Sequence, residues 1–174
     1  FIKVFWNENV NYLADYVNEE GQNLYVRPNQ IIACSLEYSP LSDEMKRDVL
    51  DVVKGMLLTP RGLRTLSPRN SLYKGQYEGN QMERDQAYHQ GTVWAWLIGP
   101  YIEANFRLYG KSFAKEAKNL LAGFEDDMTV YGVCSVNEIY DGNPPYTPNG
   151  CISQAWSVGE ILRSMAMIKK YVKK

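Results

Sequence analysis

Hydrophobic residues recur at roughly helical spacing in six segments of the chain. In the first segment, Phe5, Leu13 and Val17 follow this spacing and Gly21 supplies a C-terminal stop, which predicts a helix over about residues 2–20. The other five segments predict a short helix after Pro28, a helix capped by Ser42, and helices over about residues 91–109, 112–131 and 152–172.

Two long segments, residues 64–89 and 132–151, show no periodicity and are expected to be loops. The helix at 91–109 is apolar on most sides, whereas the one at 112–131 is charged outside a single stripe, so inner and outer helices should alternate. No segment shows a convincing strand pattern. We therefore predict an all-α fold of stacked helical hairpins, a single all-helical segment over residues 1–174, with both long loops at the end where inner helices begin.

Composition narrows the classes of partner. The 174 residues carry 19 Lys and Arg against 20 Asp and Glu, so there is no basic field of the kind that binds nucleic acid. No apolar run reaches the roughly 18 residues of a membrane-spanning helix, and no signal-peptide pattern opens the chain. These features favour a cytoplasmic protein with neither nucleic acid nor membrane as partner.

Three cysteines, Cys34, Cys134 and Cys151, lack the spacing of a disulfide framework or a zinc site. With a single histidine in the chain, no metal or cofactor is implied. Reduced thiols are the simpler prediction, and one Cys134–Cys151 bridge across the second loop stays open as the alternative.

Two polar segments suggest carbohydrate chemistry. One packs Tyr88, His89, Gln90, Trp94 and Trp96 into nine residues. Flat aromatic faces beside short polar groups suit a sugar ring, because its C–H faces stack and its hydroxyls need hydrogen-bond partners. The other segment places two carboxylates in the second loop, at positions 138 and 141. Together they indicate a site built from long loops on a helical scaffold.

Six motifs in order resemble the C-terminal part of the amylo-α-1,6-glucosidase domain of bacterial-type glycogen debranching enzymes, over nearly the whole chain. They are Arg27-Pro-Asn-Gln30, Gly62-Leu-Arg-Thr-Leu-Ser-Pro68, Tyr73-Lys-Gly-Gln-Tyr-Glu-Gly79, the Arg84–Trp94 segment, Asn137-Glu-Ile-Tyr-Asp-Gly142 and Gly150-Cys-Ile-Ser-Gln-Ala-Trp-Ser157.

The resemblance implies an (α/α)6 barrel related to glucoamylases and trehalases, which releases glucose from α-1,6 branch stubs of glycogen or an α-glucan oligosaccharide with inversion. Six helices would form about half of such a barrel. The chain also begins inside an amphipathic pattern without a Met, so we expect a C-terminal fragment of a longer glycosidase domain that lacks its N-terminal half. Inner faces left uncovered would favour self-association of the fragment.

Inverting glycosidases need two carboxyl groups, one as general acid and one as general base, about 6.5–9.5 Å apart. By resemblance Glu138 matches the base; the alternative is a surface glutamate in a Pro-rich loop. The family's acid is an Asp in a Trp-Met-Asp-Ala-Lys-type motif, which this sequence lacks, so the chain alone is expected to be inactive. Asp85 is interpreted as a loop residue paired with Arg84, and Asp141 as a loop-shaping residue first and a sugar ligand second.

His89, Gln90 and Trp94 resemble the family's glucose-binding motif, and Tyr88 is grouped with them as a sugar contact. The alternative is that His89 caps a helix and Trp94 belongs to the core. Trp96, two residues further along a predicted helix, should face the other side and serve packing.

Four further residues complete the candidate sugar-binding set. Arg27 and Asn29 can hydrogen-bond sugar hydroxyls, or instead cap a helix and form an ion pair. Gln154 and Trp156 open the last helix beside the loop of Glu138, where Gln154 can orient the base or its water. Two other functions stay open: a non-catalytic glucan-binding helical module, and a helical scaffold without a ligand.

Overall fold

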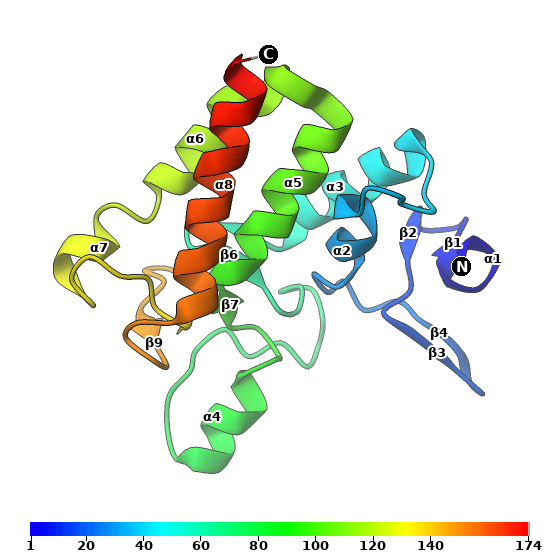
Figure 1. Ribbon diagram of the computed structural model, residues 1–174. Helices are drawn as coiled ribbons and strands as arrows, with labels where there is room; N and C mark the ends of the chain where they lie inside the picture. The colour runs from blue at the N-terminus through cyan, green and yellow to red at the C-terminus, as the bar shows by residue number, and fades with distance from the viewer. Residues whose placement is uncertain (174) are drawn as a thin grey trace.

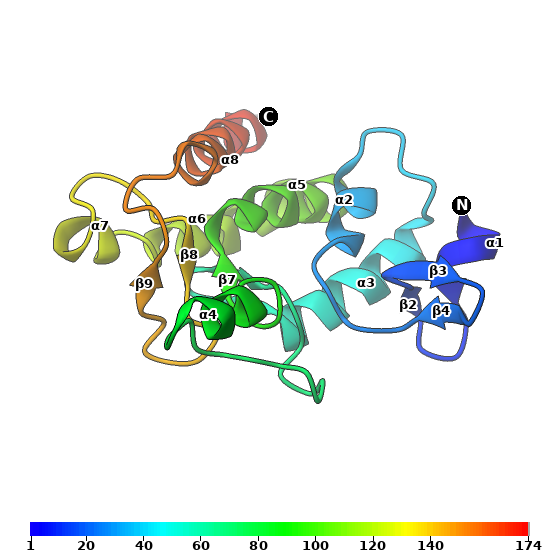
Figure 2. The same ribbon diagram turned by 90° about the horizontal axis from the view of Figure 1, so that it is seen from below.

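The computed structural model describes residues 1–173 and shows helices in two layers (Figures 1 and 2). Helices α2 (Gln30–Ser35), α5 (Ile98–Tyr109) and α8 (Ala155–Lys173) lie side by side in one layer. Helices α3 (Asp43–Met56) and α6 (Ala114–Ala122) pack against them from behind. The alternation of inner and outer helices is thus present in these five elements.

The helix predicted after Ser42 shows why the pattern succeeds there. The Ser42 hydroxyl accepts a hydrogen bond from the Met45 N–H at 3.2 Å, which satisfies one of the free donors at the helix start. Val49, Leu50 and Val53 are buried on one face, as the apolar stripe requires. The short helix after Pro28 and the last helix are present as α2 and α8.

The predicted helix over residues 2–20 is wrong. The segment forms one turn of helix and two small antiparallel hairpins: α1 (Ile2–Phe5), β1 (Trp6–Asn7) with β2 (Tyr12–Leu13), and β3 (Tyr16–Asn18) with β4 (Gly21–Asn23). Asn7 and Asn18 each accept a hydrogen bond from the backbone N–H two residues later, and Asn11 adopts a left-handed φ of 57°. Asparagine side chains that bond the local backbone in this way favour turns over helix.

The prediction of an all-α fold is corrected by a five-stranded antiparallel sheet in the order β5-β6-β7-β8-β9. Its strands are β5 (Leu58–Thr59), β6 (Gly62–Arg64), β7 (Val93–Trp94), β8 (Ile139–Tyr140) and β9 (Pro148–Asn149). Strands of two or three residues are too short to produce an alternating pattern, which is why the sequence did not reveal them. The first predicted loop connects β6 to β7, and β8 and β9 lie within the second predicted loop. The sheet therefore holds the two loops next to each other.

Three other boundaries differ from the prediction. The expected helix 91–109 begins as strand β7 and the 3-10 turn η1 (Ala95–Leu97), because β7 is held in the middle of the sheet. The expected helix 112–131 is divided into η2 (Gly110–Phe113), α6 and α7 (Asp127–Val130). The first predicted loop contains α4 (Gln81–Ala87), whose start is closed by a capping box of Asn80 and Glu83.

Helix α8 buries one face and exposes another. Ile161 and Ile168 are buried, whereas Trp156, Leu162 and Met165 are about half exposed, at 48%, 60% and 45%. Exposed apolar side chains on one helix favour association, so self-association of the chain stays a prediction. Among residues 1–173, no helix combines the length and the apolar character that crossing a membrane demands.

We predict that Gly62→Ala destabilises the protein by about 2 kcal/mol or more. Gly62 has a φ of +127°, and a Cβ there would lie 2.5 Å from the backbone oxygen of Trp94 in the neighbouring strand. The matched control is Gly55→Ala in α3, where a Cβ meets nothing within 4 Å, and which should be neutral or stabilising by up to about 1 kcal/mol. Melting temperatures of the two purified variants test this, and equal values would contradict it.

Candidate functional site

The centre of the candidate site is the carboxylate of Glu138, just before strand β8. Its Oε1 accepts a hydrogen bond from the Tyr88 hydroxyl at 2.5 Å, and its Oε2 accepts one from the Cys151 N–H at 3.0 Å. The Glu138 N–H also donates to the Cys151 carbonyl at 3.0 Å, which fixes the backbone on the same side. The pairing of β8 with β7 and β9 therefore positions Glu138 so that residues of both long loops contact its side chain.

Hydrogen bonding decides the charge of Glu138. Burial by itself raises the pKa of this carboxyl, but hydrogen bonds from the Tyr88 hydroxyl, the Cys151 N–H and the Gln154 side chain favour the carboxylate, and the net result is a lowered pKa. Burial and the bond to Glu138 raise the pKa of Tyr88, so its hydroxyl keeps its proton and remains a donor. Glu138 is thus an ionised acceptor at neutral pH.

A glycine makes room for this carboxylate. Gly150 has a φ of +70°, and a Cβ at that position would lie 2.5 Å from Oε2 of Glu138. Any larger residue there would be strained and would displace the carboxylate. This close approach accounts for the glycine that precedes Cys151.

Aromatic rings form one wall beside Glu138. The Tyr88 ring meets Trp94 edge-on at 4.9 Å, and the His89 ring stacks on Trp94 at 5.2 Å with 10° between the planes. Trp156, at the start of α8, contacts Trp94 at 5.7 Å and Trp96 at 5.5 Å. Trp96 is partly buried against the core, as its predicted packing role requires, although Trp94 lies on a strand and Trp96 in a 3-10 turn rather than on one helix.

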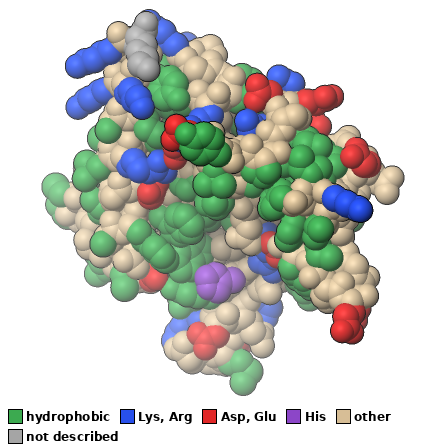
Figure 3. Space-filling model, turned by 45° about the vertical axis from the view of Figure 1, so that its right-hand side comes forward, with side chains coloured by type: hydrophobic (Ala, Val, Ile, Leu, Met, Phe, Trp, Pro, Cys, Tyr) green, Lys and Arg blue, Asp and Glu red, His purple; other side chains and the backbone are tan. Residues whose placement is uncertain are grey.

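The histidine of this wall lies at the molecular surface beside hydrophobic side chains (Figure 3). Burial, and then the positive charge of Arg27, lower the pKa of His89 below its ordinary value of about 6.5. The imidazole is therefore neutral at pH 7, so it offers both a donor and an acceptor. Trp94 is 5% exposed and donates its indole N–H to the Tyr88 carbonyl at 3.0 Å, so it supports the wall from behind.

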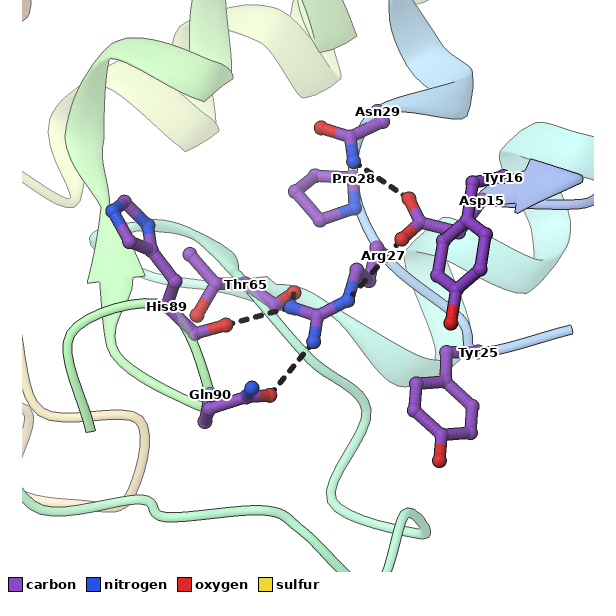
Figure 4. A pocket seen from close by; sticks show the side chains of 9 residues that line it. All are labelled: Asp15, Tyr16, Tyr25, Arg27, Pro28, Asn29, Thr65, His89 and Gln90. Atoms are coloured by element: carbon purple, nitrogen blue, oxygen red, sulfur yellow. Dashed lines mark hydrogen bonds and ion pairs between the residues drawn. The ribbon is translucent and has the colours of Figure 1, made fainter. Parts of the chain in front are cut away.

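Arg27 ties the first loop to the second hairpin. Its guanidinium donates to the carbonyls of Thr65 at 3.0 Å and His89 at 2.6 Å, and to Oε1 of Gln90 at 2.7 Å. It also pairs with Asp15, at 3.4 Å between Nε and Oδ2 (Figure 4). The ion pair that the sequence left open for Arg27 is therefore present.

Asn29 shares the same carboxylate. Its amino group donates to Oδ1 of Asp15 at 2.6 Å. Asn29 stands at the N-cap position of α2 and makes no side-chain capping bond there. Asp15 was not singled out from the sequence, because it was assigned to a helix that does not exist.

The two other acidic candidates are used by the protein itself. Oδ1 of Asp141 accepts from the Tyr77 N–H at 2.8 Å and from Asn149 at 3.1 Å, which agrees with a loop-shaping role. Asp85 lies on helix α4 and accepts from Gln81 at 2.6 Å, so its prediction as a loop residue is wrong. In the described part of the chain, Arg84 directs its guanidinium to Gly79 and Gln81 rather than to Asp85.

A buried aspartate that the sequence analysis missed supports Glu138 from behind. Asp127, at the start of α7 and 7% exposed, accepts from the Tyr140 hydroxyl at 2.7 Å and from the Asn137 amide at 3.1 Å. One of these donors directly precedes Glu138 in the sequence, and the other follows it two residues later. Nothing in a charged segment predicted as helix distinguished Asp127 from its neighbour Asp126.

Gln154 lies at the start of α8, and its backbone N–H donates to the Val136 carbonyl at 3.0 Å. Its side chain helps to lower the pKa of Glu138, as an orienting role predicts. All three cysteines carry free thiols, and Cys134 and Cys151 are both exposed. The bridge between them is thus absent from the structure.

The chain is similar in sequence and in structure to known proteins. A family model described as amylo-alpha-1,6-glucosidase matches residues 1–163. A glycogen debranching enzyme of Saccharomyces cerevisiae is 28% identical over 97 residues, which make up 52% of this chain and 6% of that protein. The structure of a neutral trehalase from Saccharomyces cerevisiae superposes with a TM-score of 0.66 at 15% identity, covering 99% of this chain and 30% of the trehalase.

The likeness to trehalase shows the fold: the chain has the same arrangement of helices as part of the trehalase. Since the family model spans nearly all of the residues, the chain belongs to the amylo-α-1,6-glucosidase family. It spans only a minor part of either of the two relatives.

We predict that Asp127→Ala destabilises the protein by about 2–4 kcal/mol, because two buried donors lose their acceptor. Asp126→Ala is the matched control, since the neighbouring carboxylate is 76% exposed and pairs with Arg61 at the surface. Asp127→Asn keeps one acceptor oxygen and should recover part of the loss. Chemical denaturation of the three variants measures this, and equal effects of the two alanine variants would contradict it.

We also predict that Tyr88→Phe raises the pKa of Glu138, because it removes the donor to Oε1. A lowered carboxyl pKa contributes stability above the unfolded value of about 4.3, and this contribution is lost as pH falls through the folded value. The variant should therefore lose about 1 kcal/mol at pH 7 and less at low pH. An NMR titration of the carboxyl, with Tyr38→Phe as the exposed control, checks the direction; an unchanged titration would count against it.

Proposed function

We propose that this chain supplies the general-base side of an inverting α-1,6-glucosidase site, with Glu138 as the base. The observation that carries the proposal is the ionised Glu138 carboxylate, oriented on both oxygens and bordered by aromatic rings. Membership of the amylo-α-1,6-glucosidase family supports the reaction class. The substrate is an α-glucan, from which a glucosyl branch stub is removed.

In this mechanism Glu138 accepts a proton from a water molecule as that water attacks the anomeric carbon. Each carboxylate oxygen already has one donor, and a carboxylate has further lone pairs with which to accept a hydrogen bond from the water. The carboxyl on the opposite face of the sugar protonates the leaving oxygen, so the α-linked substrate yields β-glucose. Trp156, which is about half exposed, provides a face for the sugar ring, and His89 provides hydrogen bonds to its hydroxyls.

The general acid is proposed to come from outside these residues. Asp85 and Asp141 both direct their carboxylates to protein donors, which supports neither as the acid. We infer that the chain acts as one part of a longer glycosidase site and is inactive by itself. The same observation favours one alternative, a glucan-binding module that performs no hydrolysis, if the full-length protein also lacks an opposing carboxyl.

We expect Glu138→Gln to lower turnover of the full-length gene product by at least about a thousandfold, because the amide cannot accept the proton from water. The substrate is a malto-oligosaccharide with one α-1,6-linked glucosyl stub. Glu37→Gln makes the same chemical change at an exposed position beyond α2 and should leave turnover intact. Near wild-type turnover of Glu138→Gln would reject the base assignment.

Two further readouts separate the alternatives. NMR observation of the anomer first released should show β-glucose for wild type. The chain alone should be silent on the same substrate while the full-length protein is active. Silence of both, with retained oligosaccharide binding, would select the binding module.

A further inference from the structure

One pocket of the structure is bordered by His89, whose ring stacks on Trp94 in the wall beside Glu138. It has a volume of about 510 Å³ and is lined by residues at the start of β3, between β4 and α2, just after β6 and before β7 (Figure 4). Tyr16, on strand β3, and Tyr25, just after β4, form one wall, and His89 stands on the opposite side. Neither tyrosine lies in one of the six motifs.

The pocket is joined to Glu138 by a continuous series of rings. The Glu138 carboxylate contacts Tyr88, Tyr88 contacts Trp94, and Trp94 carries the stacked His89 that borders the pocket. A glucan chain bound at Glu138 can thus continue past His89 into this space. The volume exceeds that of a single sugar ring.

The floor of the pocket presents a donor and an acceptor whose orientations are fixed by charge. Arg27 binds Oε1 of Gln90, which leaves the Gln90 amino group free, since no described residue accepts from it. Asp15 binds the amino group of Asn29, which leaves the Asn29 carbonyl oxygen on the opposite side of that amide. Asp15 and Arg27 also pair with each other and so stay in place. If the Gln90 amide turned over, its amino group would face the Arg27 guanidinium; if the Asn29 amide turned over, its carbonyl oxygen would face the Asp15 carboxylate. Both contacts are unfavourable, so the two amide orientations are fixed.

The pocket has no net charge, which favours a neutral ligand. Asp15 and Arg27 neutralise one another, with only 12% and 16% of their side chains exposed. His89 is neutral at pH 7 for the reasons given above. A pocket with no net charge, fixed amide groups and phenol rings suits a neutral polyhydroxylated ring and gives an anion no attraction.

Both tyrosines are accessible, and hydrogen bonds hold the Tyr16 side chain and the backbone of Tyr25. The Tyr16 hydroxyl accepts from the Asn23 amino group at 3.3 Å, and the Asn23 carbonyl oxygen accepts from the Tyr25 N–H at 3.0 Å. Half of Tyr16 and about a third of Tyr25, 50% and 36%, remain accessible. A ring that is both held and accessible, as that of Tyr16 is, is suited to stacking against a ligand at low entropic cost.

We propose that this pocket is an outer subsite for the glucan chain beyond the scissile linkage, in which Tyr16 and Tyr25 determine the preference for chain length. The proposal rests on the proposed function for its substrate class. It predicts that these tyrosines affect long substrates and leave the shortest ones unchanged.

The experiment uses the full-length gene product and two substrates, isomaltose and a malto-oligosaccharide with one α-1,6-linked glucosyl stub. Tyr16→Ala/Tyr25→Ala should lower kcat/KM on the long substrate about tenfold or more, mainly through KM, which corresponds to about 1.4 kcal/mol. On isomaltose the same variant should stay within about twofold of wild type. Tyr38→Ala, at a tyrosine that is 90% exposed elsewhere, is the matched control and should change neither.

A binding arm keeps this test independent of the assignment of Glu138. Linear maltohexaose is titrated by calorimetry into Glu138→Gln protein with and without the two tyrosine substitutions. Weaker binding in the tyrosine variant supports the subsite even if Glu138→Gln remains active. Equal maltohexaose affinity and equal kcat/KM on the long substrate, in a variant that melts like wild type, would overturn the proposal.

A third variant tests the fixed amides. Asp15→Asn removes the charge that orients Asn29 and pairs with Arg27. It should reproduce the loss that depends on chain length, with isomaltose turnover retained. Equal losses on both substrates would show that Asp15 supports the fold alone and would remove the amides from the proposal.

Discussion

The pairing of strand β7 with strand β8 is the constraint on which the site depends. Trp94 lies opposite Ile139 and Val93 opposite Tyr140, so two loops far apart in the sequence share one register. A slip of one residue would turn Glu138 away from Tyr88, because side chains alternate along a strand. Two-residue strands hold little energy themselves. Their register is secured from outside, by the bond of Arg64 to the Gly142 carbonyl and by the buried aspartate beneath β8.

Polar groups buried under the sheet make this arrangement specific. Asp127 accepts hydrogen bonds from Asn137 and Tyr140, and Glu138 accepts hydrogen bonds from Tyr88 and Cys151. The loop around Glu138 is therefore held by two separate sets of hydrogen bonds. They reduce the motion of a carboxylate that must remain aligned with its water. A buried network of this kind is costly when one member is lost, since the others cannot find solvent. Stability and orientation of the base thus depend on the same few bonds.

The sequence predicted the long helices well and the segments between them poorly. The helix after Ser42 was predictable because its cap and apolar stripe are local features, and α2 and α8 follow the same logic. The first segment failed because three asparagines favour turns although its apolar spacing imitates a helix. The central sheet could not be predicted, since its strands are set by contacts between distant loops. Glu138, Tyr88 and His89 were candidates because of their motifs, whereas Asp15 and Asp127 lay in segments assigned to helices and were not candidates.

Three of the chain's four tryptophans, Trp94, Trp96 and Trp156, meet in one cluster, and the fourth, Trp6, is buried near the N-terminus. Indole rings this close exchange excitation energy and respond strongly to changes in local polarity. The intrinsic fluorescence of the chain is therefore dominated by the wall beside Glu138, with Trp6 as an internal reference outside it. The protein carries an optical probe of this wall, which reports a change in its surroundings without an added label.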